Sequence, residues 1–173
     1  MKRFIGAICS GTASLFTFIL LSLNWLTSKT TVSGELIPAS TTSAGVDGWN
    51  LISDGENIAG GTLYKLSAIL LIIVAILLLT SAVFVILQNL NIIKVKFNFA
   101  KMNMILLTIF VILCTLMLIG AHLMADELTG TQSIYESMLT ITTTVSFGAW
   151  FLIVIATAAW MTAWFTYTEK IKE

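Results

Sequence analysis

The sequence predicts an all-α membrane protein: an antiparallel bundle of four transmembrane helices with a small extracytoplasmic element that could contain β-strands. Two observations predict this class. The chain has 173 residues, of which 57% are hydrophobic and 10% are charged, whereas a soluble domain carries about 25% charged residues. Four apolar runs lie at about 4–26, 66–90, 102–124 and 147–167, and each could cross a hydrocarbon core of about 30 Å as a helix. We therefore expect one four-span domain over residues 1–173.

The charged residues outside these runs predict how the chain is oriented. Because cytoplasmic loops of membrane proteins are enriched in Lys and Arg, both termini should be cytoplasmic and the loops at 27–65 and 125–146 extracytoplasmic. No Asn-x-Ser/Thr sequon occurs, so we expect a multi-pass protein of a plasma (inner) membrane. The basic residues of the cytoplasmic stretches are Lys2, Arg3, Lys94, Lys96, Lys101, Lys170 and Lys172, and the acidic residues of the two loops are Glu35, Asp47, Asp54, Glu56, Asp126, Glu127 and Glu136.

The first apolar run is longer than the hydrophobic core of about 7–15 residues in a signal peptide, so we expect a retained helix. Gly6, Ser10 and Ser14 recur in it at four-residue spacing, and Ala159 and Ala163 form a similar strip in the fourth run. Small residues let the backbones of membrane helices approach closely. These five residues therefore predict helix packing within the bundle, with a self-association face as the alternative.

The first loop, 27–65, is too long to remain without structure of its own. It opens with β-prone Thr and Val, contains the only proline, Pro38, and continues into a turn-rich stretch at 47–61. These features favour a short hairpin or a small sheet. In the second loop the segment MLTITTTV at 138–145 alternates apolar residues with Thr, which is typical of a strand. This segment could pair with the first loop or form the first turns of the fourth helix.

None of the four runs contains Asp, Glu, Lys or Arg. Ionisable groups inside a membrane mark proton relays and substrate paths, so their absence disfavours a proton-coupled exporter. The two cysteines, Cys9 and Cys114, both lie inside runs, which disfavours a disulfide framework, a zinc site and thiol redox chemistry. No nucleophile–base pair is visible. We therefore predict no catalytic residue, no cofactor, no metal and no nucleic-acid partner.

His122, the only histidine, lies near the end of the third run, four residues before Asp126. Residues at this spacing share one face of a helix, so His122 is a candidate pH sensor or part of a metal site completed by Glu127. Two or three ligands on one segment make a poor metal site. We favour an interfacial histidine that contacts water or a neighbouring helix.

Trp49 is the most suggestive residue of the first loop. A tryptophan in a water-facing loop needs cover for its large apolar body, and the acidic residues Asp47, Asp54 and Glu56 surround it in sequence. The acidic residues lack the spacing of an EF-hand. Trp49 with its acidic rim is therefore a candidate partner-binding site, with a lid packed on the helix ends as the favoured alternative.

The arrangement of four spans, a long first loop and a shorter second loop resembles that of the claudin/PMP22-type tetraspan membrane proteins. In claudins the first loop carries a Trp soon after the first span, a Gly-Leu-Trp motif and a cysteine pair. Trp25 and the segment Gly48-Trp49-Asn50-Leu51 are loosely similar to the tryptophan features. The cysteine pair is missing here, the loop is shorter, and Trp49 follows the glycine one place early. The resemblance implies an adhesion, barrier or accessory role.

Together these features predict a non-enzymatic membrane protein that acts by self-association or as an accessory subunit of a larger complex, with the lipid bilayer as its surroundings. The alternative is an oligomeric channel or transporter subunit. Hydroxyl side chains in the runs could line such a path, although Ser and Thr also bond to their own helix backbone. The candidate path residues are Thr12, Ser14, Thr80, Ser81, Thr108 and Thr115.

Overall fold

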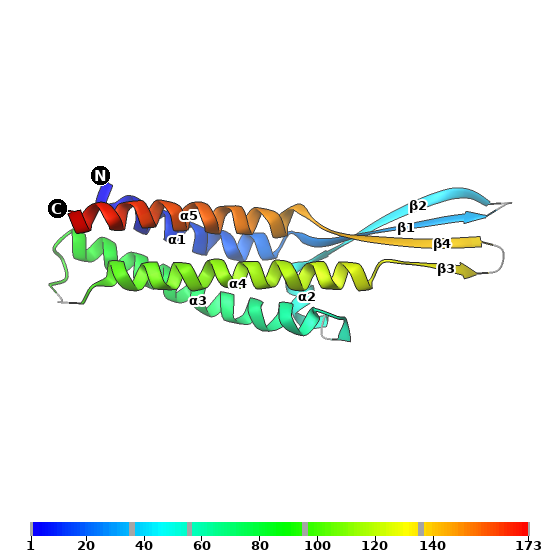
Figure 1. The fold of residues 1–173 in the computed structure, drawn as a ribbon, viewed down its shortest axis with the longest axis horizontal. Coiled ribbons are helices and arrows are strands. Elements are labelled where there is room, and N and C mark those ends of the chain that lie inside the picture. Colours follow the sequence, from blue (N-terminus) through cyan, green and yellow to red (C-terminus); the bar gives the residue numbers. More distant parts are fainter. Residues whose placement is uncertain (1, 35–36, 55–56, 95–96, 135–136, 173) are drawn as a thin grey trace. The chain divides into compact units, whose positions relative to one another are not determined.

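The computed structural model describes residues 2–34, 37–54, 57–94, 97–134 and 137–172 (Figure 1). The chain divides into two compact units. A helical unit comprises Met1–Leu20, Ser67–Thr115 and Phe151–Glu173, and a sheet unit comprises Leu21–Leu66 and Leu116–Trp150. In chain order the elements are α1 (Lys2–Leu21), β1 (Asn24–Gly34), β2 (Ile37–Asp47), α2 (Gly48–Asp54), α3 (Gly61–Asn89), α4 (Phe99–Glu127), β3 (Gly130–Ile134), β4 (Ser137–Val145) and α5 (Phe147–Lys172).

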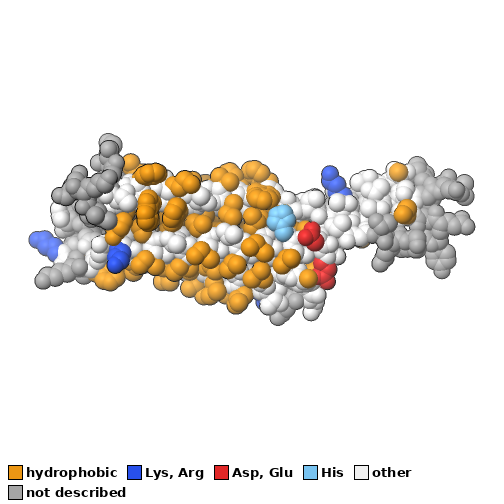
Figure 2. All heavy atoms as spheres, in the orientation of Figure 1, with side chains coloured by type: hydrophobic (Ala, Val, Ile, Leu, Met, Phe, Trp, Pro, Cys, Tyr) orange, Lys and Arg blue, Asp and Glu red, His pale blue; other side chains and the backbone are white. Residues whose placement is uncertain are grey.

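Four helices are long and apolar enough to cross a membrane: Phe4–Leu21, Gly61–Asn89, Phe99–Glu127 and Phe147–Thr168. The prediction of four such helices is therefore confirmed. With 29 residues each, α3 and α4 measure about 43 Å at about 1.5 Å per residue, which exceeds a hydrocarbon core of about 30 Å. Figure 2 shows hydrophobic side chains gathered over the helices on the visible face. Soluble monomers rarely expose apolar surface of this extent.

Helix α1 runs antiparallel to α3 in the helical unit. Near the start of α1, Ala7 lies in a buried cluster with Ala82 and Val85 of α3. Two turns later, the Ser14 hydroxyl donates a hydrogen bond of 2.5 Å to the carbonyl of Ala75. The contacts move backward along α3 as they advance along α1, which fixes the direction of the pair.

The structure changes the predicted helix boundaries. Helix α1 ends at Leu21, and Asn24 begins β1, so the predicted span 4–26 is too long. The apolar run continues from α1 into β1 because Trp25 is buried within the protein. It is 1% exposed and packs edge-on against Tyr64, with ring centroids 5.3 Å apart. Helices α3, α4 and α5 begin or end up to five residues beyond the predicted spans.

Both long connections contribute to one antiparallel sheet with the strand order β2-β1-β4-β3. In this sheet Thr30 of β1 lies opposite Thr42 of β2 on one side and opposite Ile141 of β4 on the other. The small-sheet prediction is confirmed, as is the pairing of the 138–145 segment with the first loop. The alternative, in which that segment begins the fourth helix, is wrong. Thr, Val and Ile suit a pleated, half-exposed surface, and both β1 and β2 reach 11 residues.

Candidate functional site

One face of the sheet is formed mainly by hydroxyl side chains. Successive strand residues alternate between faces and paired residues share a face, so the register places Thr27, Thr31 and Ser33 of β1 on the same side as their partners on β2 and β4. We call this side the hydroxyl face. Lys29 is its one charged residue among the described side chains, opposite Ser43 and Thr142. The other members of the hydroxyl face are Thr41, Gly45, Met138, Thr140 and Thr144.

The hydroxyls of this face differ in how they are used. Next to the helix ends, Thr27 Oγ1 lies 2.5 Å from Ser146 Oγ, and the Thr144 hydroxyl donates to the Thr27 carbonyl at 3.4 Å. Further along the strands the described residues include no partner for the hydroxyls of Thr31, Ser33, Thr41, Ser43, Thr140 and Thr142. Strand spacing of about 4.8 Å and a repeat of about 6.8 Å along each strand make these hydroxyls a regular array that can donate and accept hydrogen bonds.

The opposite face is mixed, and part of it is anchored. Thr143 is 7% exposed; its hydroxyl lies 3.1 Å from Ser28 Oγ, and its backbone N–H donates to Thr129 Oγ1 at 3.0 Å. Thr129 in turn donates to the Ala125 carbonyl of α4 at 2.8 Å. This chain of hydrogen bonds ties β4 to the last turn of α4 within the sheet unit.

Strand β2 forms one edge of the sheet, and its described side chains from Ala39 to Val46 are all exposed. Its pairing with β1 is regular from Ser40 to Val46, with register shifts at both ends of that stretch. The other edge strand, β3, has only five residues. On the face in Figure 2 the described part of the strands is mostly neither hydrophobic nor charged.

The base of the sheet unit is a tightly packed aromatic cluster. Trp25 and Tyr64 are both buried, and the Tyr64 hydroxyl donates to the Gly48 carbonyl at 3.4 Å. Glycine is required beside them, because a Cβ on Gly48 would lie 2.9 Å from the Leu21 carbonyl and from Trp25 Nε1. In the sequence, Trp25 is singled out only by its loose similarity to a claudin tryptophan, and its burial is not predicted. Its position directly before an alternating Thr-rich strand was the available signal for a buried role.

The candidate partner-binding residues lie around the short helix α2. Asp47 caps this helix, since its carboxylate accepts from the backbone N–H of Asn50 at 2.8 Å, the usual role of Asp at a helix start. Trp49 is 40% exposed, and its indole N–H donates to Ser22 Oγ at 3.2 Å. Asp54 is exposed at the end of α2. Glu56 lies outside the described residues.

The structure places His122 on the exposed side of α4, edge-on to the Trp150 ring at a centroid distance of 5.6 Å. Glu127, the third member of the hypothetical metal site, instead accepts a hydrogen bond from the backbone N–H of Ala59. The described residues contain no group of three His, Cys, Asp or Glu side chains that could hold a metal ion.

The small residues of the first and fourth runs lie inside the helical unit. A Cβ on Gly6 would lie 3.2 Å from the Ala163 Cα, so α1 and α5 approach closely at this glycine. Ser10 and Ser14 are fully buried, and Ala159 is 5% exposed. These residues therefore contribute to contacts within one chain, which leaves little of this strip free for a second copy.

Sequence reasoning missed Asn103, which is 4% exposed in α4. Its side-chain amide donates to Ser10 Oγ at 3.1 Å, and its carbonyl oxygen lies 3.2 Å from the same hydroxyl. A buried amide needs such a partner because desolvation without a hydrogen bond is costly. The signal was a single amide side chain within an otherwise apolar run, near the depth of Ser10 in the first run.

Most of the hydroxyls proposed to line a path are bonded to the backbone of their own helix. The Thr12, Thr80, Thr108 and Thr115 hydroxyls each donate to a carbonyl of their own helix four residues earlier. Ser14 bonds to α3 as described above. Ser81 is the buried exception, with a hydroxyl that has no partner among the described residues.

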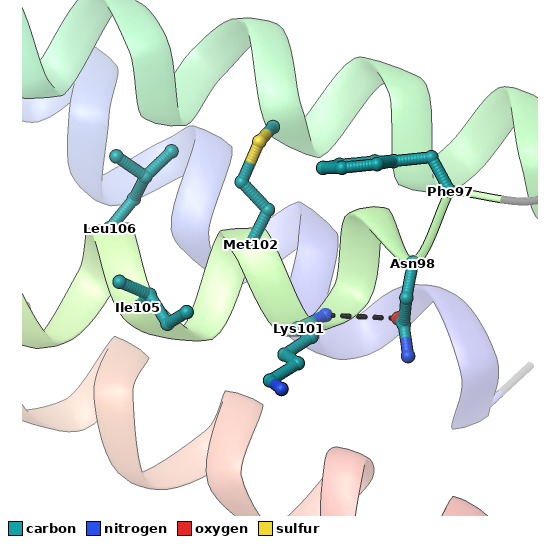
Figure 3. Close-up of a pocket in the computed structure, with 6 residues that line it drawn as sticks. All are labelled: Phe97, Asn98, Lys101, Met102, Ile105 and Leu106. Carbon is teal, nitrogen blue, oxygen red and sulfur yellow. Dashed lines mark hydrogen bonds between the residues drawn. The ribbon is translucent and has the colours of Figure 1, made fainter.

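A small surface pocket of about 270 Å³ lies at the start of α4 (Figure 3). Asn98 caps the helix there by accepting from the Lys101 backbone N–H at 3.1 Å. Lys101 is the one ionisable residue among those that line the pocket, so no acid–base pair is present. The volume of the pocket is just below the range of about 300–1,000 Å³ for small-molecule sites. The other lining residues are Phe97, Met102, Ile105 and Leu106.

Comparisons of the chain with protein-family models, with curated proteins and with solved structures found no match.

Proposed function

We propose that this chain is a non-enzymatic, multi-pass integral membrane protein that acts by association, either with itself or as an accessory subunit of a larger membrane-protein complex. The sheet unit is the part that makes the association. Both termini lie in the cytoplasm, and the loops at 27–65 and 125–146 lie on the extracytoplasmic side of a plasma (inner) membrane.

The observation that carries this proposal is the exposed sheet. Two long connections are used to build four paired strands, although compact domains usually join neighbouring helices with about 2–8 residues. On the hydroxyl face, the described residues include no partner for the hydroxyls of Thr31, Ser33, Thr41, Ser43, Thr140 and Thr142. Strand β2 leaves one edge of the sheet unpaired. A surface of this kind supports recognition through hydrogen bonds.

The four helices support an association role rather than transport through a single chain. Their central stretches carry no Asp, Glu, Lys or Arg, which are the groups that mark ion and proton paths. The buried polar pair Ser10–Asn103 is internally hydrogen-bonded. The resemblance to claudin/PMP22-type proteins agrees with an adhesion or accessory role and stays a prediction, since it is based on topology.

Affinity purification from native membranes tests the proposal. The tagged chain is extracted in mild detergent after brief cross-linking, next to an unrelated four-span protein that carries the same tag at the same abundance. The proposal predicts either a cross-linked multimer of the chain or one stoichiometric protein that is absent from the control. A chain that is cross-linked to nothing above the control, at native abundance and after overexpression, would contradict it.

The alternative, an oligomeric channel or transporter subunit, predicts flux across reconstituted vesicles. Four of the six candidate hydroxyls bond to their own helix, so a path would require new contacts between copies. Vesicles that carry the purified chain and remain tight to several cations and anions, while an unrelated channel conducts in parallel, would remove this alternative.

A further inference from the structure

We propose that β2 is a self-association edge: two copies of the chain pair their β2 strands antiparallel about a two-fold axis, which joins two four-stranded sheets into one. This inference rests on the proposed function and names the partner as a second copy. The axis passes midway between Ser43 of one copy and Ser43 of the other. Ser43 is the centre of the regular stretch from Ser40 to Val46.

The β2 edge carries almost none of the usual protection of an exposed strand edge. An edge strand exposes backbone N–H and C=O groups that can bond to another strand, and proteins usually block such an edge with charges, prolines or bulges. Between Ser40 and Val46 the strand has no charge and no proline. Its irregularities lie outside this stretch. Seven consecutive residues thus offer an edge that is regularly paired on its inner side and has no charge or proline.

Strand β2 is also complementary to itself. A two-fold axis at Ser43 places Thr42 opposite Ala44, Thr41 opposite Gly45 and Ser40 opposite Val46. The exposed side chains are small enough that a second strand meets no bulk on either face. Each pair also joins residues of the same face, as pairing across a pleated sheet requires.

The charged residues near the β2 edge are too far from their mates to oppose the pairing. The only charged residue of β2, Asp47, is four positions from the axis, so the two carboxylates lie about 27 Å apart at about 3.4 Å per residue. Lys29 pairs with Ser43, and its mate across three strand spacings is about 14 Å away. Exposed charges are largely screened beyond about 8–10 Å, so neither residue opposes pairing.

The lengths of the two edge strands favour self-pairing of β2 over growth of an open chain of copies. Pairing β2 with the β3 edge of another copy could use at most the five residues of β3. Pairing β2 with itself uses the longer edge and closes after two copies, because the two-fold contact is isologous. A closed dimer is therefore favoured over a filament.

Single-cysteine cross-linking tests this geometry in the full chain in detergent and in vesicles, with Cys9 and Cys114 replaced by Ala. Residues that lie n positions from a two-fold axis are separated from their own mates by about 6.8 Å times n along the strand, and a disulfide needs Cα atoms within about 7 Å. Ser43→Cys should therefore form a dimer with itself. Thr42→Cys and Ala44→Cys should each form less disulfide-linked dimer alone than Ser43→Cys does. When the two variants are mixed, they should cross-link to each other.

The matched control is Thr142→Cys, which is exposed on the same face but belongs to the interior strand β4. Its cross-linking defines the background. A single self-linking position elsewhere between 40 and 46, with partners symmetric about it, supports the same antiparallel pairing. Equal self-linking at all seven positions indicates a parallel or non-specific contact and overturns the proposal. So does linking of Ser43→Cys to Gln132→Cys on β3.

A second variant keeps the test independent of cysteine chemistry. Ser43→Lys places two ammonium groups at the axis and should abolish the dimer at concentrations where the wild type is dimeric, whereas Ile92→Lys, at an exposed position outside the sheet, should leave it intact. If the chain is oligomeric or bound to a partner but neither β2 test gives a signal, the β2 proposal is overturned and the association function stands. If no association exists at all, both fail.

Discussion

Among single residues, the glycines at helix contacts differ in whether the space around them could hold a Cβ atom. Gly120 of α4 faces the start of α3, where a Cβ would lie 2.9 Å from the Tyr64 amide nitrogen and 3.0 Å from the Gly60 carbonyl. Gly60 itself has φ of +80°, a conformation in which glycine is favoured. Gly11 of α1 has ordinary space, with the nearest atom, Ala82 Cβ, at 3.6 Å.

Gly120→Ala should therefore lower the free energy of unfolding by about 1–3 kcal/mol, because overpacking against backbone cannot be relieved by a side-chain rotation. Gly11→Ala is the matched control, which should be neutral or stabilising by up to about 1 kcal/mol, the difference in helix propensity. Thermal unfolding in mild detergent measures both. Equal stability of the two variants would show that the α3–α4 contact is looser than described.

Trp49→Ala separates binding from packing. Trp49 is 40% exposed and makes one hydrogen bond to Ser22, so we predict a severalfold loss of association with a small change in Tm. Trp25→Ala, at a buried site, should cost about 3–5 kcal/mol of stability. Trp49→Phe keeps the apolar body without the indole N–H. A fall in Tm of Trp49→Ala with association unchanged would assign the residue to packing.

At the scale of elements, the sequence predicts the helices better than the strands. Long apolar runs identify a span by length alone, but they do not mark where α1 changes to β1, because Trp25 and Leu26 are buried in both descriptions. The alternation at 138–145 predicts β4, whereas β2 is a run of small polar residues with weak strand preference. Its pairing with β1 depends on tertiary contacts, so the unpaired edge of β2 could not be predicted from the sequence.

The Ser10–Asn103 pair tests how α1 and α4 are held together. Hydrogen bonds between membrane helices contribute about 0.6 kcal/mol on average and up to about 1.7 kcal/mol in double-mutant cycles. We predict a coupling energy in this range between Ser10→Ala and Asn103→Ala. Thr115→Ala, an exposed hydroxyl that bonds to its own helix, should show no coupling to either. Strictly additive effects of the two buried substitutions would show that the pair adds no stability.

For the molecule as a whole, the charge pattern outside the helices predicts which side of the membrane each connection faces. The proposed topology has the two sheet-forming connections on one side of a membrane and the connection between α3 and α4 on the other. The candidate site was predicted only in part. Trp49 and Asp47 do lie beside the sheet, but the hydroxyl face and the β2 edge arise from strands far apart in sequence.

Cysteine accessibility tests this orientation. In a background without Cys9 and Cys114, Ser40→Cys on β2 should react with a membrane-impermeant maleimide in intact cells. Ile92→Cys, 65% exposed between α3 and α4, should react only after permeabilisation. The opposite pattern would reverse the orientation, and labelling of both in intact cells would show that the two sites lie on the same side.

Native mass measurement in mild detergent tests whether this chain acts by association. One chain has a mass of 18.9 kDa. We predict a species at a multiple of that mass, or at that mass plus one defined partner, with the dimer lost in Ser43→Lys. A species of one chain alone, at every protein concentration and from native membranes as well as after overexpression, would contradict it.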